Sequence, residues 1–347
     1  MKPGPPGKGI RTIPAGMVAI AVVALALALA DASAGLSKKA AKQPRGPYPS
    51  LGKCPLFPQP SVAANAPSVA DLSAWNQDIS QAPLDPNSAN YIAYINAHGA
   101  TTLHPDFGSP RPYGFPYSVV GRKQKRLRVE FTAYGDESTQ GKYRVPAKAL
   151  IEGGQGSDGD RHVISVDRRR CRLFELYRAF FEKSKKGGHW NADAGVIWDL
   201  GSAALRAPGH TSADAAGLPI FPGLIRYDEA AAGQINHAIR VTFQQTQRAW
   251  LNPASHCASN VSDPNAPPMG MRLRLNGAYD ISGLSGHARV IAAALKRYGF
   301  LVADNGSNWF FSGSSDKRWD DDNLNQLKAI PGSAFEVVQS AAAIHRC

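Results

Sequence analysis

Short stretches of alternating hydrophobic and polar residues, separated by Gly-, Pro- and Asp-rich turns, recur through the middle of this chain. Leu127, Val129 and Phe131 alternate with charged or hydroxyl-bearing residues, which is the period of a strand with one buried face. Further candidate strands cover residues 162–166, 172–180, 195–200, 235–243, 271–277 and 300–303. This succession predicts a mainly β fold, with a β-sandwich or jelly roll as the architecture.

A few helices are expected around the β domain. Asn87 or Ser88 can cap a short helix that ends at Gly99. Ser285 can cap a longer helix whose hydrophobic residues share one face, and Gly299 is placed to end it. A shorter helix is expected over residues 320–327, where acidic residues gather at the positive end of the helix dipole.

The first 34 residues are typical of an export signal. A basic start precedes an uncharged run over residues 15–30, and residues 32–34 (Ala-Ser-Ala) offer the small side chains of a cleavage site. The run is shorter than the about 20 residues that cross a bilayer. We therefore expect a secreted or periplasmic protein without a stable membrane span; an uncleaved N-terminal anchor is the alternative.

The remaining chain divides into an arm and a domain. Residues 35–68 are rich in Pro and Ala and predict a linker or an arm, followed by a single β-rich domain over residues 69–347. Cysteines stand at positions 54, 171, 257 and 347. An oxidising destination favours two disulfides over free thiols, and the spacing leaves all three possible sets of pairings open.

The charge balance favours anionic partners. The chain carries a formal net charge of +12, and because the export signal holds three positive charges and one negative charge, the mature chain carries +10. Such an excess attracts an acidic polysaccharide or a membrane surface. The basic runs at residues 122–126 and 168–170 each lie beside a predicted strand, where a solvated loop is the simplest interpretation. No nucleic-acid partner is expected, because no recognition motif accompanies the charge.

Candidate catalytic residues concentrate between residues 191 and 240, where carboxylates, His and Arg stand between turn residues. Hydrolysis of a glycosidic bond needs two carboxylates that flank it. We predict a glycoside hydrolase acting on a polysaccharide, with Asp214 and Glu229 as the catalytic pair and Asp228 as a substitute. Trp198 is the candidate platform for stacking of a sugar ring. A structural role for Asp214 in a turn or helix cap is the competing interpretation.

Two other functions remain open. In a polysaccharide lyase acting on an acidic glycan, Arg240 would neutralise a uronate carboxylate, and His237 or Tyr227 would take the neighbouring proton. Alternation along the predicted strand 235–243 places His237 and Arg240 on opposite faces, which argues against the lyase and is compatible with a buried His237. A non-catalytic polysaccharide- or cell-wall-binding protein is the other alternative.

Arginines on strand faces give a further hypothesis. Arg128, Arg240, Arg272 and Arg274 project from the polar sides of their predicted strands. If these strands are neighbours, the arginines form a cationic groove that grips carboxylates or sulfates. If they are not, they belong to a solvated outer surface.

Other catalytic patterns are weaker. The pairs His104–Asp106 and Asp160–His162 place a carboxylate near an imidazole, but neither has the spacing of a metal site. Dinucleotide, P-loop and nucleophile-elbow motifs are missing from the sequence. No metal and no cofactor is expected.

Four short segments carry a resemblance: residues 75–78 (WNQD), 103–108 (LHPDFG), 159–163 (GDRHV) and 303–307 (ADNGS). Together they resemble a group of secreted, mostly bacterial proteins of uncharacterised function, over about residues 70–338. The resemblance implies one exported domain and no particular activity. Residues 234–237 are also similar to the Gln-Ile-His strand motif of jelly-roll alginate lyases. In that motif Gln and His are two residues apart, whereas here they are three apart, so no role is carried over.

Overall fold

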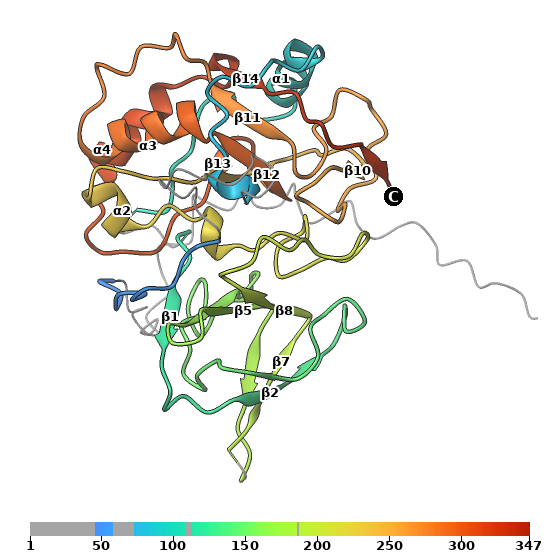
Figure 1. The fold of residues 1–347 in the computed structure, drawn as a ribbon, viewed down its shortest axis with the longest axis vertical. Coiled ribbons are helices and arrows are strands. Elements are labelled where there is room, and N and C mark those ends of the chain that lie inside the picture. Colours follow the sequence, from blue (N-terminus) through green and yellow to red (C-terminus); the bar gives the residue numbers. More distant parts are fainter. Residues whose placement is uncertain (1–45, 58–72, 109–112, 186) are drawn as a thin grey trace, which may run out of the picture. The chain divides into compact units, whose positions relative to one another are not determined.

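The computed structural model describes residues 46–57, 73–108, 113–185 and 187–347. The predicted export signal and most of the predicted arm lie outside these residues. The described chain is mainly β, with four sheets and a few short helices (Figure 1). This confirms the predicted fold class, a β-sandwich or jelly roll with a few peripheral helices.

Two four-stranded sheets form a sandwich. The first has the order β1 (Tyr117–Val120), β4 (Val163–Asp167), β5 (Arg172–Tyr177) and β8 (Ala194–Asp199). The second has the order β3 (Lys142–Tyr143), β2 (Leu127–Phe131), β7 (His189–Ala192) and β6 (Phe180–Glu182). Val129, Tyr143, Phe174 and Trp190 from the two sheets share one buried core. The period-two pattern of β2 and β5 supplies the apolar face that this core requires.

A five-stranded mixed sheet carries most of the helices. Its order is β13 (Phe310–Phe311), β9 (Ile239–Phe243), β12 (Phe300–Asn305), β11 (Arg272–Leu275) and β14 (Phe335–Val337). The helices are α1 (Ser88–Ala97), α2 (Tyr227–Ala231), α3 (Gly286–Arg297) and α4 (Asp321–Asn325). Strand β10 (Ala249–Trp250) pairs with β15 (His345–Arg346) near the C-terminal residue. Hydrophobic residues of α1, α3 and the five-stranded sheet form the largest core cluster.

The predicted helices are confirmed, and their ends follow local signals. Ser285 is the N-cap residue of α3, and Gly299 follows the helix with a φ of +66°. Asp320 accepts hydrogen bonds from the backbone N–H groups of Asp322 and Asn323 and so caps α4. Asn87 precedes α1.

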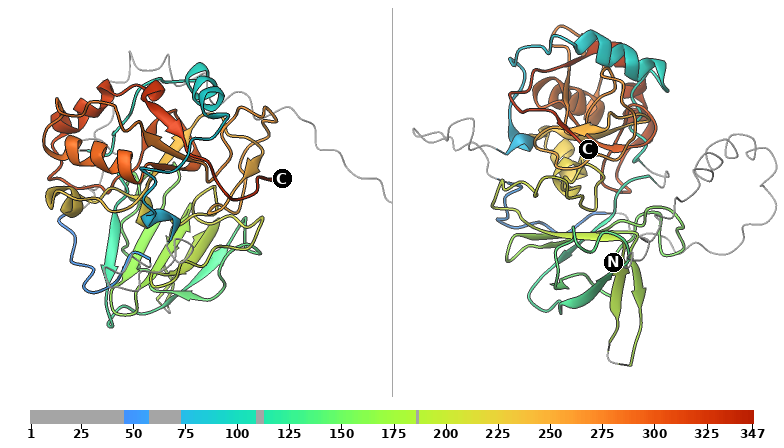
Figure 2. Two further views of the ribbon diagram at one scale, coloured as in Figure 1. Left: turned by 45° about the horizontal axis from the view of Figure 1, so that its top comes forward. Right: turned by 90° about the vertical axis from the view of Figure 1, so that its right-hand side faces the viewer.

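Residues 200–225 join the sandwich to the five-stranded sheet (Figure 2). The carboxyl group of Glu175, which is fully buried on β5, accepts hydrogen bonds from three N–H groups there. These donors are the backbone of Ile220, the backbone of Phe221 (2.8 Å) and the indole of Trp198 (3.0 Å). The sandwich and the connecting segment are therefore held together by a buried polar contact as well as by apolar packing.

Two disulfides are present, as predicted, joining Cys54 to Cys171 and Cys257 to Cys347. Such bonds are typical of proteins that fold outside the reducing cytosol. Within the described part of the arm, Tyr48 stacks on Tyr117 of β1, with 3.8 Å between ring centroids. In the described ranges, no helix combines the length and the apolar character needed to cross a membrane.

The sequence missed or misplaced several strands. The predicted strand 235–243 begins only at Ile239, so His237 precedes it and the argument from opposite faces does not apply. The predicted strand 172–180 ends at Tyr177, and Arg178 then adopts a φ of +49° before β6 begins. Among the described residues, seven short strands lie outside every predicted strand: β1, β3, β7, β10, β13, β14 and β15.

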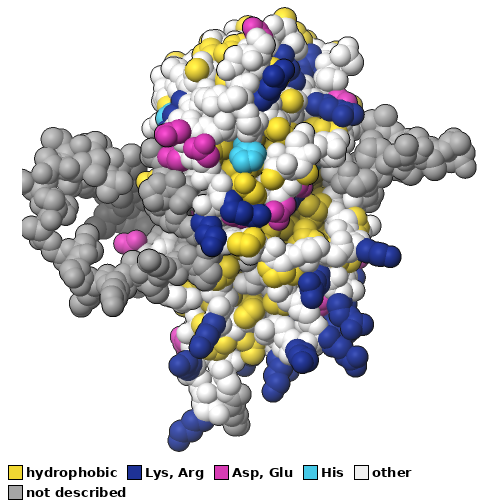
Figure 3. All heavy atoms as spheres, turned by 90° about the vertical axis from the view of Figure 1, so that its left-hand side faces the viewer, with side chains coloured by type: hydrophobic (Ala, Val, Ile, Leu, Met, Phe, Trp, Pro, Cys, Tyr) yellow, Lys and Arg dark blue, Asp and Glu magenta, His cyan; other side chains and the backbone are white. Residues whose placement is uncertain are grey.

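The predicted cationic groove is not formed. Arg240, Arg272 and Arg274 lie on the five-stranded sheet with buried side chains, whereas Arg128 is exposed on β2 of the sandwich. The buried arginines bind groups of this chain, such as the Glu336 carboxylate, which lies 2.7 Å from Nε of Arg274. Exposed Lys and Arg side chains gather instead over the sandwich half of the face in Figure 3.

Candidate functional site

A polar pocket of about 330 Å³ lies where the sandwich meets the five-stranded sheet. The loop before β4 supplies Asp160 and His162, the end of β5 supplies Tyr177, and the end of β12 supplies Asp304 and Asn305. Tyr134, residues 211–215, His256 and Ala258 complete the wall. Several of these side chains can carry or exchange a proton.

Asp304 is the central acidic residue of this pocket. The pairing of β12 with β9 shifts register between Val302 and Asp304, an irregularity that re-aims the side chains after it. The Asp304 side chain is 26% exposed. Burial, and then the nearby Asp214 carboxylate, raise the pKa of Asp304 to about 7. A carboxyl group with such a pKa can give or take a proton at neutral pH.

Beneath Asp304 lies a buried ion pair. Arg240 binds Oδ2 of Asp214 through Nη2 at 2.7 Å and Nε at 3.0 Å, and its Nη2 approaches Oδ2 of Asp304 at 3.5 Å. The Arg240 Nη1 group also donates to the Ser312 hydroxyl, at 2.8 Å. The side chain of Asp214 has no solvent exposure, so it does not reach a substrate. Burial raises the pKa of Asp214, and the Arg240 guanidinium opposes that rise.

A second pair, between the buried His162 and the half-buried Glu152, fixes the loop that carries Asp214. Nδ1 of His162 lies 2.6 Å from Oε2 of Glu152, and Nε2 lies 2.9 Å from the carbonyl oxygen of Ala213. Burial disfavours the charged imidazole, but Glu152 outweighs burial and raises the pKa of His162 to about 9. His162 therefore carries a positive charge at neutral pH, with both ring N–H groups engaged. It anchors the loop and is a poor candidate for a catalytic base.

The pocket wall also offers a second carboxylate and two phenols. The Tyr177 hydroxyl lies 3.5 Å from Oδ1 of Asp160, whose side chain is exposed. Burial, and then Asp160, raise the pKa of Tyr177 to about 12, so this phenol keeps its proton. Tyr134 is 42% exposed. An exposed aromatic ring on the wall of an acidic pocket is a suitable surface for a sugar ring.

The two predicted catalytic carboxylates, Asp214 and Glu229, belong to different ion-pair clusters. Glu229 lies with Arg226 and His237, whose Nε2 is 3.3 Å from Oε2 of Glu229. Burial disfavours the Glu229 carboxylate, but Arg226 and His237 outweigh burial and lower the pKa of Glu229 to about 2. Nδ1 of His237 lies 2.7 Å from the carbonyl oxygen of Ala238. Glu229 is thus an ionised structural partner with no proton to give at neutral pH.

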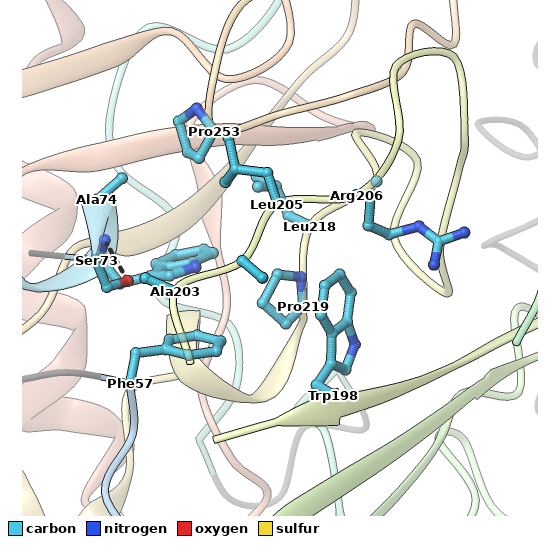
Figure 4. A pocket seen from close by; sticks show the side chains of 13 residues that line it. Phe57, Ser73, Ala74, Trp198, Ala203, Leu205, Arg206, Leu218, Pro219 and Pro253 are labelled. Carbon is cyan, nitrogen blue, oxygen red and sulfur yellow. Dashed lines mark hydrogen bonds between the residues drawn. The ribbon is translucent and has the colours of Figure 1, made fainter. Parts of the chain in front are cut away.

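The other predicted residues lie outside the pocket wall. The exposed Asp228 pairs with Arg318 at 2.8 Å, and the Arg318 guanidinium lies 4.1 Å from the centroid of the Tyr227 ring. Trp198 is 8% exposed and borders a separate hollow of about 30 Å³, where its indole lies beside Pro219 (Figure 4). That hollow holds little more than a water molecule. Trp198 also borders an open pocket of about 400 Å³ with Asp199 and Arg206, but with 8% exposure its indole presents little surface there.

Sequence reasoning placed Asp214 and Arg240 within the candidate region but missed Asp304, Tyr177 and Tyr134 as site residues. The sequence did contain a signal for part of this site. Two of the segments that carry the resemblance, residues 159–163 and 303–307, supply Asp160, His162, Asp304 and Asn305 to the same pocket.

Among the residues that the structure describes, no group of three or more His, Cys, Asp and Glu side chains is arranged to hold a metal ion. Comparisons with protein-family models, with curated proteins and with solved structures found no match.

Proposed function

We propose that this protein is an exported glycoside hydrolase that acts on a polysaccharide, with Asp304 as the general acid. The observation that carries the proposal is the Asp304 carboxyl group, which lies at a polar pocket with its pKa raised to about 7. A protonated carboxyl group is what the departing glycosidic oxygen requires at neutral pH.

The other pocket residues have complementary roles in this proposal. Asp160 is the second carboxylate, which either activates water or attacks the sugar carbon. Asp214 and Arg240 set the pKa of Asp304 in opposite directions: the Asp214 carboxylate raises it and so helps Asp304 to keep its proton, whereas Arg240 lowers it. Tyr134 provides the exposed ring against which a sugar stacks.

Hydrolysis is favoured over elimination because Arg240 is not free to meet a substrate. Its side chain is 3% exposed, and its guanidinium nitrogens already bind Asp214 and Ser312. A lyase needs an accessible cation to neutralise the uronate carboxylate, and Tyr177 keeps its proton and is therefore a weak base.

The test is incubation of the purified exported protein with a panel of neutral and acidic polysaccharides. Reducing ends and the ultraviolet absorbance of unsaturated uronates are measured together. We expect new reducing ends without new absorbance, and loss of that activity in Asp304→Asn but not in Asp228→Asn, which removes an exposed carboxylate elsewhere. New absorbance would assign the protein to the lyases. Equal activity in both variants, or retention on a glycan without turnover, would also overturn the proposal.

A further inference from the structure

We propose that one end of the sandwich is a binding surface for an anionic polysaccharide that bears carboxylate or sulfate groups. This surface, the basic end, consists of Lys53 and the basic residues of the runs 122–126 and 168–170. These side chains are exposed, and none of them forms an ion pair with another described residue. The inference goes beyond hydrolysis and stands whether or not Asp304 is catalytic.

Strand topology brings the two basic runs together. Strands β1 and β4 are parallel neighbours, and Val120 lies opposite Asp167 at their last positions. The backbone N–H of Arg168 continues this contact by donating to the carbonyl oxygen of Val120, at 3.2 Å. Because parallel strands end at the same edge of a sheet, the residues after β1 and those after β4 leave the sandwich side by side.

One buried carboxylate organises both runs. Oδ1 of Asp167 accepts hydrogen bonds from the backbone N–H groups of Arg169 and Arg170, at 3.1 and 3.3 Å. Oδ2 of Asp167 pairs with Nε of Arg144 at 3.0 Å, and Nη1 of Arg144 donates to the carbonyl oxygen of Gln124 at 2.7 Å. Asp167 is therefore occupied by Arg144 and by the turn, and it does not form an ion pair with the exposed arginines.

The disulfide adds Lys53 to the same place. Cys171 directly follows the 168–170 run, and its bond to Cys54 holds the preceding residue, Lys53, beside that run. The basic end is thus fixed by strand pairing, by a buried ion pair and by a covalent bond. A loop that only faces solvent requires neither the ion pair nor the covalent bond to hold its charged residues in place.

The chemistry of the basic end favours a glycan over a membrane or a nucleic acid. None of the residues that make up the basic end is an exposed large hydrophobic; those of the described residues are Leu84, Tyr113, Tyr134, Phe180, Leu205 and Ile344. Membrane-binding segments insert apolar side chains, and single-stranded nucleic acids stack on aromatic ones. Guanidinium groups instead match carboxylates and sulfates through paired hydrogen bonds.

The experiment measures retention and affinity of the exported protein on polygalacturonate and on heparin, with dextran as the uncharged control. We expect binding to at least one of the two acidic glycans that weakens as salt rises, and no binding to dextran. The triple variant Arg168→Gln, Arg169→Gln, Arg170→Gln is expected to bind roughly tenfold more weakly, since three exposed charge pairs are lost. The second triple variant, Lys123→Gln, Lys125→Gln, Arg126→Gln, should show a similar loss.

A matched variant removes the same charge from other exposed sites: Lys183→Gln, Lys185→Gln, Arg289→Gln. It should bind like the unmodified protein. Equal weakening in this control would mean that net charge alone drives binding and would overturn the proposal, as would tighter binding to anionic phospholipid vesicles or to DNA. Binding is compared only between the basic-end variants and the matched variant, without turnover, so failure of the proposed hydrolysis does not affect this result.

Discussion

Arg240 binds Asp214 through two of its nitrogens, at 2.7 and 3.0 Å, in a site from which the Asp214 side chain has no access to solvent. Its approach to Asp304 is longer, at 3.5 Å. The Arg240 guanidinium therefore stabilises the Asp214 carboxylate more than the Asp304 carboxylate, and Asp304 keeps a high proton affinity. Burial raises the pKa of Asp214 as well, while Arg240 opposes that rise. Two neighbouring acids with unequal access to one cation are an arrangement that suits acid–base catalysis.

Replacement of Asp304 by Asn removes the proposed proton donor. We expect kcat/KM on a natural polysaccharide to fall by about 10²-fold or more. The loss should be much smaller on an aryl glycoside whose leaving group departs without a proton. Parallel assays of the two substrates check this, and an equal loss on both would show that Asp304 does not act as the acid.

The activity should decline in alkaline solution. Asp304 binds its proton below about pH 7 and releases it above that value, so kcat/KM should fall as the pH rises through about 7. Rates measured from about pH 5 to about pH 9 at constant ionic strength test this. An activity that continues to increase up to the alkaline end would contradict the assigned role.

Glu229 is expected to stabilise the fold without taking part in the reaction. Its folded pKa of about 2 lies below the ordinary value of 4.5, so its contribution is present above pH 4.5 and is lost as the pH falls toward 2. Glu229→Gln should lower the free energy of unfolding by about 2 kcal/mol at neutral pH, because Arg226 and His237 lose a charged partner. Urea unfolding measures this, with the exposed Glu182→Gln as the control. A folded variant that has lost its activity would contradict this assignment.

The contribution of Glu175 to the stability of the fold should depend on pH in the opposite way to that of Glu229. Burial raises the pKa of Glu175 to about 7, so its contribution to stability is full below 4.5 and is lost as the pH rises through about 7. An amide cannot accept all three N–H donors that Glu175 meets, and Glu175→Gln should cost about 2 kcal/mol in mildly acidic solution. The cost should shrink toward pH 8, as followed by unfolding at several pH values. A cost that grows with pH would refute the raised pKa.

Features specified by neighbouring residues were predictable from the sequence. Helix α3 has Ser285 at its N-cap position, one apolar face and Gly299 directly after its C-cap residue, so its position required no knowledge of the rest of the chain. Strand β2 was found through strict alternation. Strands β1 and β7 are four residues long, and their positions depend on pairing with distant strands.

The site was predictable only in part because distant residues define it. Asp214 stood out among turn residues, but the proton affinity of Asp304 depends on Asp214, on burial and on the irregularity of β12. The sequence pattern predicted His237 within a strand, but that strand begins two residues later, at Ile239. The partners of His237 are Arg226 and Glu229. No local pattern marks such contacts.

The parallel pairing of β9 with β12 has a consequence for the order of synthesis. Arg240 enters the chain with β9, but Asp304 arrives with β12, after β10, β11 and α3 have been made. A nascent chain that stops before β12 holds Arg240 and Asp214 without the proposed acid. The proposed chemistry therefore requires a chain that has been made at least through β12.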